Sequence, residues 1–384
     1  MGFQNDVVVV EGYDAALYVE RGHLVVRDGF ASEGKSRETR FPRGRCEVKR
    51  IVVRAPGGTI SMPAIDWCAR MGIAISFVAS DSTLLNCMTV DHPHDGPVKR
   101  AQAISAVTDD ALRLARYLLT QKLTSQIDAI DHDFARFTIG NTTSRKAAIS
   151  QIASCREALT TATTLVDFLT LEGRAAQVYW DLLVETPLPW RAWSYKRIPA
   201  HWAAISPRTS GKRERVHDAT DPFNAILNYC YTLLEVETRI ACEAAGLDPD
   251  LGLLHVDDRL RESFIYDLLE PLRAPVDMLA LEYLHKIELR PHLFHELRDG
   301  VVRLDPDLAE GLAKVLMPQM AKRAMAAAND FLKQVRKVHV KLARFGGHFR
   351  LSREGSIQWQ KSILDPIPLS SGRRSSTLQR PAVT

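Results

Sequence analysis

The pattern of hydrophobic and polar residues changes its period near residue 90. Before that point, short apolar runs typical of β-strands alternate with turn residues, and we expect one short helix capped by Ser61 with a proline in its first turn. The expected helix spans 61–70, the expected strands span 7–10, 16–19, 24–26, 48–53 and 73–78, and turns lie at 20–23 and 56–58.

Beyond residues 91–97, which are rich in proline, glycine and polar residues, apolar side chains recur with a period of about 3.6, as in amphipathic helices. Three such stripes are Leu112, Ala115, Leu118, Leu119 and Leu123; Leu165, Phe168, Leu169, Ala176, Tyr179 and Leu183; and Ile226, Leu227, Tyr231 and Leu234. The sequence therefore predicts an α+β multidomain protein, with a small, mostly antiparallel N-terminal β domain followed by a larger all-helical domain. We place the β domain at 1–92, a linker at 93–99, the helical domain at 100–364 and a disordered basic tail at 365–384.

The composition of the chain says more about where the protein is located in the cell than about what it does. With 50 basic and 46 acidic residues in 384, the formal net charge of +4 permits a polyanionic partner without requiring one. The six cysteines form no C-x-x-C pair, so we interpret them as buried free thiols in a reducing compartment. The sequence has neither a signal-peptide pattern nor an apolar run of roughly 20 residues, so we expect a cytoplasmic protein without a membrane partner.

Acidic and imidazole side chains lie next to the apolar stripes of the helical part. Glu172 lies within the second stripe, His255 follows a turn-rich connection, and Asp267 and Glu270 stand one turn apart on a helix that Pro271 should end or kink. Each has an ordinary alternative explanation: a buried Glu paired with an Arg or a helix terminus, a core or capping His, and a solvated acidic pair. Together they supply hard oxygen donors and one nitrogen, a set that suits Mg²⁺ or Mn²⁺ and phosphodiester chemistry.

Four ordered motifs carry these residues. They read E-G-x-x-A-x-x-Y-aromatic at 172–180, D-P-x-N-A-x-L-N-Y-x-Y-x-L-L at 221–234, G-L-D-P-x-x-G-x-L-H at 246–255, and D-L-x-E-x-x-R at 267–273 followed by Asp277. Weaker similarities at 60–67, 72–77, 100–102, 114–116 and Lys122 extend the match over most of the chain up to about residue 364. In these motifs the chain resembles the CRISPR-associated adaptation integrases, metal-dependent DNA endonucleases that insert new spacers into CRISPR arrays.

The resemblance implies a site and partners. It places the metal ligands at Glu172, His255 and Glu270, with Asp267 as a further catalytic acid, and Mg²⁺ or Mn²⁺ as the cofactor. It implies that the 3′-hydroxyl of a short DNA fragment attacks a phosphodiester at a repeat end. It also implies a homodimer formed through the β domain, double-stranded and branched DNA as substrates, and a complex with the small ferredoxin-like CRISPR-associated adaptation nuclease.

Two basic segments are candidates for DNA contact. The loop at 206–217 is one, and the stretch in which basic residues alternate with Trp190, Trp193 and Tyr195 is the other. Their basic residues are Arg191, Lys196, Arg197, Arg208, Lys212, Arg213 and Arg215. The alternative is solvated loop charge over a packed aromatic cluster.

Two other functions remain open. One is a catalytically silent DNA-binding or assembly subunit, against which the complete set of four site residues argues. The other is a transposon-type integrase with the same fold and chemistry.

Overall fold

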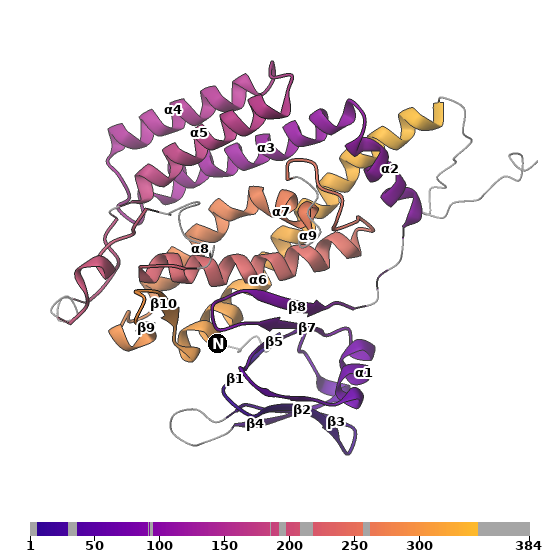
Figure 1. Ribbon diagram of the computed structural model, residues 1–384, viewed down its shortest axis with the longest axis vertical. Coiled ribbons are helices and arrows are strands. Elements are labelled where there is room, and N and C mark those ends of the chain that lie inside the picture. Colours follow the sequence, from indigo (N-terminus) through magenta and orange to yellow (C-terminus); the bar gives the residue numbers. More distant parts are fainter. Residues whose placement is uncertain are drawn as a thin grey trace, which may run out of the picture. The chain divides into compact units, whose positions relative to one another are not determined.

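The N-terminal part of the chain folds into two four-stranded sheets (Figure 1). One sheet has the strand order β1-β5-β7-β8 and the other the order β4-β3-β2-β6. The strands are β1 (Val7–Glu11), β2 (Ala15–Glu20), β3 (His23–Arg27), β4 (Glu38–Pro42), β5 (Arg50–Arg54), β6 (Gly58–Ile60), β7 (Ala74–Val78) and β8 (Leu84–Met88). The computed structural model describes residues 6–29, 37–90, 92, 95–184, 186–191, 197–207, 218–255 and 262–344, with side chains up to residue 337.

The strand pairing is half parallel and half antiparallel, where the sequence pattern led us to expect mostly antiparallel pairs. The pairs β1–β5, β5–β7 and β2–β6 are parallel, and the pairs β2–β3, β3–β4 and β7–β8 are antiparallel. Short turns join β2 to β3 and β7 to β8, whereas the connection from β5 to β7 runs through helix α1 (Met62–Met71), and such a crossover leaves its two strands parallel. The sequence showed the turns and the helix but not the pairing partner of each strand.

Helix α1 forms where the sequence predicts it. The Ser61 side chain accepts a hydrogen bond from the Ala64 N–H, and the helix ends at Gly72, whose φ of 67° is the left-handed conformation that glycine adopts without strain. Trp67 is buried against the second sheet and donates its indole N–H to the Gly22 carbonyl at 3.1 Å. The helix is therefore fixed by both termini and by one large buried side chain.

The C-terminal part is helical except for one short hairpin. Helices α3, α4 and α5 lie side by side, and α6 is buried along most of its length (Figure 1). The helices are α2 (Gly96–Ala106), α3 (Asp110–Asp128), α4 (Thr142–Ala158), α5 (Leu165–Leu183), α6 (Pro222–Ala244), α7 (Ser263–Leu269), α8 (Arg273–Lys286) and α9 (Pro306–Arg344), and the hairpin consists of β9 (Phe294–Glu296) and β10 (Val302–Leu304). The predicted α+β class, with a β part before a helical part, is confirmed.

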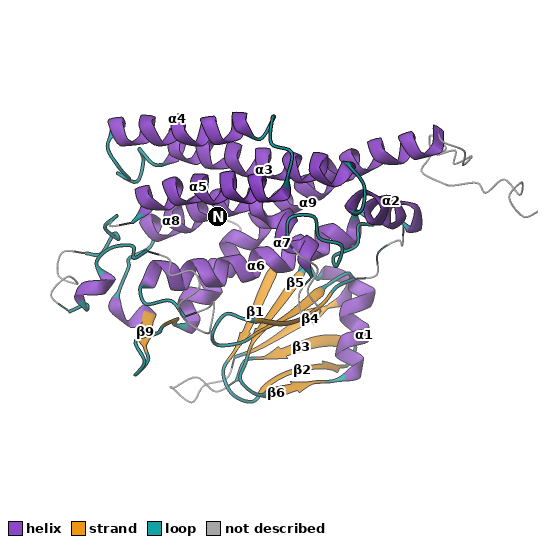
Figure 2. Cartoon of the chain, turned by 45° about the horizontal axis from the view of Figure 1, so that its top comes forward, coloured by secondary structure: helices purple, strands orange, loops and turns teal. Residues whose placement is uncertain are grey.

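The first sheet lies between the second sheet and the helices (Figure 2). Its Val9 and Val52 belong to the core that the helices form, while Ile51 and Ile75 on its other face pack with the second sheet and α1. The strands end at Met88 and α2 begins at Gly96, which agrees with a change of structure near residues 93–99. The domain bounds themselves stay a prediction, and the tail at 365–384 lies outside the described residues.

A buried ion pair crosses this contact between strands and helices. The Arg50 guanidinium donates two hydrogen bonds to the Glu237 carboxylate of α6, at 2.7 and 2.8 Å, and the Glu237 side chain is only 1% exposed. Burial raises the pKa of Glu237 although Arg50 opposes the rise.

Among the helices that the structure describes, none has the length and apolar character that crossing a bilayer would require.

Candidate active site

Glu172 is positioned by α5, a helix whose N-terminus is well capped. Thr164 and Asp167 form a reciprocal capping box there, and the buried face of the helix carries Phe168 and Tyr179. The Glu172 side chain is 25% exposed, so it lies at the edge of the interior rather than fully within it, and its carboxylate contacts Lys122 of α3. The ordinary alternative for this glutamate, a basic partner, is therefore present, and it is a lysine and not an arginine.

Asp267 holds the loop that carries His255. Its fully buried carboxylate accepts backbone hydrogen bonds from Leu253, Leu254 and His255 at 2.5, 3.0 and 3.1 Å. The same carboxylate lies 2.6 Å from Nδ1 of His255, and this hydrogen bond is the main reason why the pKa of the imidazole is raised. The ring orientation is therefore fixed by a carboxylate, as in metal sites where an acid behind the histidine sets its tautomer.

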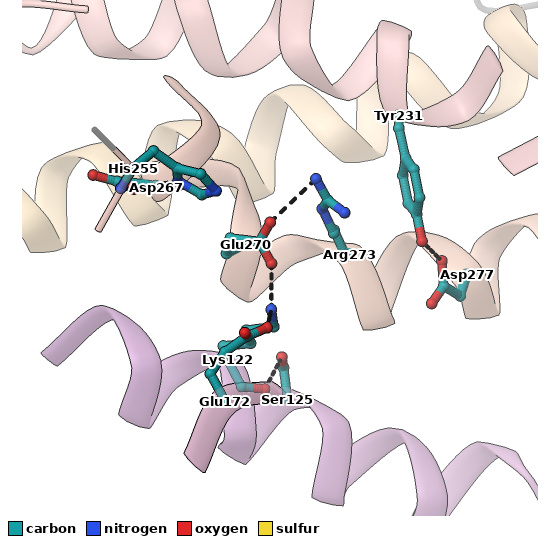
Figure 3. A network of polar contacts seen from close by, with 9 residues as sticks. All are labelled: Lys122, Ser125, Glu172, Tyr231, His255, Asp267, Glu270, Arg273 and Asp277. Atoms are coloured by element: carbon teal, nitrogen blue, oxygen red, sulfur yellow. Dashed lines mark hydrogen bonds and ion pairs between the residues drawn. The ribbon is translucent and has the colours of Figure 1, made fainter. Parts of the chain in front are cut away.

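Glu270 lies in a cluster of opposite charges (Figure 3). Lys122 Nζ lies 2.5 Å from one carboxylate oxygen, and an Arg273 nitrogen lies 3.1 Å from the other. Burial favours a raised pKa, but the charges of Arg273 and Lys122 outweigh it and lower the pKa of Glu270 to about 2. The pKa of Lys122 is raised because its two carboxylate partners outweigh the effect of burial. Both groups are thus charged at neutral pH.

The two neighbouring acids have separate partners. Asp267 lies in α7, and Glu270 begins the 3-10 turn Glu270–Leu272 that follows it, so the helix ends just before Pro271 as expected. Asp267 binds the His255 loop and Glu270 binds the basic cluster. Each acid is therefore stabilised by its own partners, which offsets the repulsion between the two carboxylates.

A cavity of about 160 Å³ adjoins this cluster. At its far end the Asp277 carboxylate accepts hydrogen bonds from the Tyr179 and Tyr231 hydroxyls, at 3.0 and 2.5 Å, and Arg273 lies over the Tyr231 ring. The cavity is lined by Lys122, Gln126, Glu172, Ala176, Tyr179, Trp180, Tyr231, Glu270, Arg273, Ala274 and Asp277. Polar groups of both charges therefore surround a space next to the predicted ligands.

The predicted ligands are of the types that bind a hard divalent ion, but an ion can bind between them only after a lysine ammonium moves away. Two carboxylates and an imidazole are donors that Mg²⁺ and Mn²⁺ accept, and Nε2 would be the donor of His255 because Nδ1 faces Asp267. As placed, no three His, Cys, Asp or Glu side chains in the described part of the chain are grouped to hold a metal ion. The Lys122 ammonium lies between the carboxylates of Glu172 and Glu270, so the residues fit an ion if this ammonium moves.

The structure links the four predicted residues in two pairs, Asp267 with His255 and Glu172 with Glu270, and does not group any three of them as a metal site. The charges of His255 and Glu270 are close enough to shift each other's pKa, and Glu172 and Glu270 share the Lys122 ammonium. The sequence patterns assign no role to Lys122. A lysine inside the apolar stripe of α3 was the available signal, because such a charge needs a buried partner.

The predicted DNA contacts are described only in part. Arg191 is exposed and pairs with Glu288 at 3.0 Å, and Arg197 is exposed. Trp190 is buried, stacks on Trp202 and donates its indole N–H to a carbonyl, so it offers no face for a base. Lys196, Arg208, Lys212, Arg213 and Arg215 lie outside the described residues.

Comparison with known proteins gives consistent matches. Residues 8–316 match the family model described as CRISPR associated protein Cas1. A CRISPR-associated endonuclease Cas1 of Archaeoglobus fulgidus is 28% identical over 298 residues, which span 74% of this chain and 79% of that protein.

Two solved structures share the fold. A casposase bound to integration product has a TM-score of 0.68 at 20% identity and covers 88% of this chain and 91% of its own. A Cas6-RT-Cas1–Cas2 complex has a TM-score of 0.60 at 16% identity and covers 87% of this chain and 36% of its own.

Proposed function

Because the chain belongs to the Cas1 family, we propose that it is a metal-dependent DNA endonuclease and integrase that inserts short DNA fragments into a CRISPR array. The observation that carries the proposal is that Glu172 and Glu270, from separate segments, share the Lys122 ammonium beside a charged cavity, while His255 is close enough to lower the pKa of Glu270. The relative from Archaeoglobus fulgidus is named an endonuclease, which supports the class of reaction.

Glu172, His255 and Glu270 would hold the ion, and Asp267 would keep Nε2 of His255 turned toward it. When bound, a divalent ion polarises a phosphodiester and stabilises negative charge on the departing oxygen. Arg273, which is held in place by Glu270 and the Tyr231 ring, supplies a fixed positive charge at the edge of the cavity. These groups would orient a backbone phosphate between the two carboxylates and the arginine.

The reaction exchanges one ester bond for another. The 3′-hydroxyl oxygen of the incoming fragment forms a new bond to phosphorus, the bond from phosphorus to the 3′-oxygen of the target strand breaks, and the hydroxyl proton ends on that departing oxygen. The number of phosphodiester bonds is conserved, so no energy-rich cofactor is needed. With water in place of the hydroxyl, the same groups would catalyse hydrolysis, which is the endonuclease activity.

DNA and protein partners belong to the same proposal. Arg191, Arg197 and the basic residues at 208–215 would contact phosphates of double-stranded or branched DNA. A homodimer and a complex with the small ferredoxin-like CRISPR-associated nuclease would hold two such sites on one DNA fragment, and the structural neighbour that contains Cas1 and Cas2 supports this arrangement. In this proposal the protein acts in the cytoplasm, where its DNA substrates would lie.

An integration assay tests the proposal. A labelled DNA fragment with free 3′-hydroxyls, a plasmid that carries a CRISPR array, the small partner nuclease and Mn²⁺ should give joined products with the native protein. Glu172→Ala, His255→Ala and Glu270→Ala should each reduce the products to background while circular dichroism and dimer size stay unchanged. Glu282→Ala, which removes a glutamate from the helical ion pair with Lys286, should leave the products unchanged. Equal products from Glu172→Ala and the native protein would disprove the site.

A second candidate is a transposon-type integrase, favoured by the fold similarity to the casposase. The same assay separates the two, because the CRISPR function requires joining at repeat ends whereas the alternative would join equally well to plasmids without an array. A silent assembly subunit would bind DNA and give no products with either plasmid.

A further inference from the structure

Lys122 lies where two predicted metal ligands meet. Its ammonium contacts Glu172 of α5 and lies 2.5 Å from a Glu270 oxygen, and the residue is only 8% exposed. A Mg²⁺ ion bound to the same oxygens would lie about 2.1 Å from them. Two cations at such distances from the same oxygens would repel each other strongly in a buried site, so the ammonium and the ion exclude each other.

Gln126 offers the ammonium another position. It lies one helical turn after Lys122 on α3, lines the same 160 Å³ cavity and is 5% exposed. Its side-chain oxygen has no hydrogen-bond donor among the described residues. A buried carbonyl oxygen without a donor is unfavourable, and a lysine four residues earlier on the same helix face is within its reach.

We propose that Lys122 is a positioning residue that pairs Glu172 with Glu270 until a divalent ion enters, and then moves its ammonium to the Gln126 side-chain oxygen. The proposal rests on the metal site of the proposed function. The cavity has room for the moved group, since its volume is several times the roughly 30 Å³ that one water molecule occupies in the liquid. Arg273 stays on the second Glu270 oxygen, so that carboxylate keeps one partner throughout.

Two substitutions in the full-length protein separate the two positions of the ammonium. Lys122→Met removes the competing cation, so Mn²⁺ should bind at least about tenfold more tightly by calorimetry. The same variant leaves two carboxylates facing each other, so it should melt at a lower temperature than the native protein in EDTA and gain more on addition of Mn²⁺. Gln126→Leu removes the second position together with an unpaired buried oxygen, so Mn²⁺ should bind severalfold more weakly while the melting temperature in EDTA does not fall.

The double variant provides the decisive comparison. If Gln126 acts through Lys122, then adding Gln126→Leu to Lys122→Met should leave Mn²⁺ affinity as it is in Lys122→Met alone. Lys122→Arg keeps the charge and should not show the tighter binding. Arg50→Met, which breaks a buried ion pair at the sheet, should lower the melting temperature equally in EDTA and Mn²⁺ and leave the affinity unchanged.

Each outcome decides one claim. Unchanged or weaker Mn²⁺ binding by Lys122→Met would overturn the competition between ammonium and ion. Native affinity in Gln126→Leu, or additive effects in the double variant, would overturn the movement to Gln126. If Glu172→Ala binds Mn²⁺ as the native protein does, the metal site of the proposed function fails instead, and the inference about Lys122 fails with it.

Discussion

Replacing Asp267 with Asn would remove one charge from the interior and test how His255 is oriented. The carboxylate accepts three backbone hydrogen bonds from the loop at residues 253–255 and one from the His255 ring. Asn has the same shape but only one acceptor oxygen. Whichever way its amide turns, an NH₂ group faces two of the four donors, so two contacts are lost.

The magnitude follows from these contacts. A hydrogen bond to a charged group contributes about 1.5–3 kcal/mol, so losing two should destabilise the loop and its helix by about 3 kcal/mol or more. Removing the acid behind a metal-binding histidine typically costs about 10–100-fold in metal affinity or activity. Because the hydrogen bond that His255 donates to Asp267 is the main cause of the raised pKa of His255, that pKa should fall toward its ordinary value.

Strand transfer at several Mn²⁺ concentrations, together with NMR titration of the ¹³C-labelled His255 ring, would measure both effects. Asp95→Asn is the control, because Asp95 caps α2 through a hydrogen bond from the Val98 N–H, a role that Asn fills as well as Asp. Native activity and an unshifted His255 pKa in Asp267→Asn would refute the role given to this carboxylate.

Three further predictions concern stability, each checked by urea unfolding. Arg50→Met should cost about 3–5 kcal/mol, because it leaves the buried Glu237 charge without its partner; a loss below 1 kcal/mol would contradict this. Burial raises the pKa of Glu11 from 4.5 to about 7 against the effect of Arg54, so its proton favours the folded state. The stability of the native protein relative to Glu11→Gln should therefore be greatest below pH 4.5 and fall as the pH rises through about 7, whereas a constant difference would contradict it. Thr164→Ala should cost about 1 kcal/mol by removing the cap of α5, and Thr164→Ser should restore most of it.

Much of the fold could be predicted because burial follows the local pattern. The apolar runs gave β1, β2, β3, β5 and β7, and the stripes gave α3, α5 and α6. Strands β4 and β8 were missed because most of their side chains are exposed or only partly buried, and β6 because three residues are too few to show an alternating pattern. Parallel pairing could not be predicted, since it depends on where a crossover brings a distant strand.

The candidate site, like the fold, could be predicted from the sequence only in part. Residue types, together with the motifs that the chain shares with the integrase family, indicated Glu172, His255, Asp267 and Glu270 as candidates. Their partners depend on packing between segments far apart in the sequence: Asp267 binds a loop more than ten residues earlier, and Glu270 binds a lysine from α3. A lysine in an apolar stripe indicates a buried acidic partner but does not identify which acid it is.

The central claim is that Glu172, His255 and Glu270 share one divalent ion. Anomalous diffraction from a crystal soaked in Mn²⁺ would test it most directly. We expect one peak in contact with both glutamates and Nε2 of His255, with the Lys122 ammonium withdrawn toward Gln126. A peak that contacts none of these three side chains, or no peak beside them when Mn²⁺ supports integration, would contradict the account.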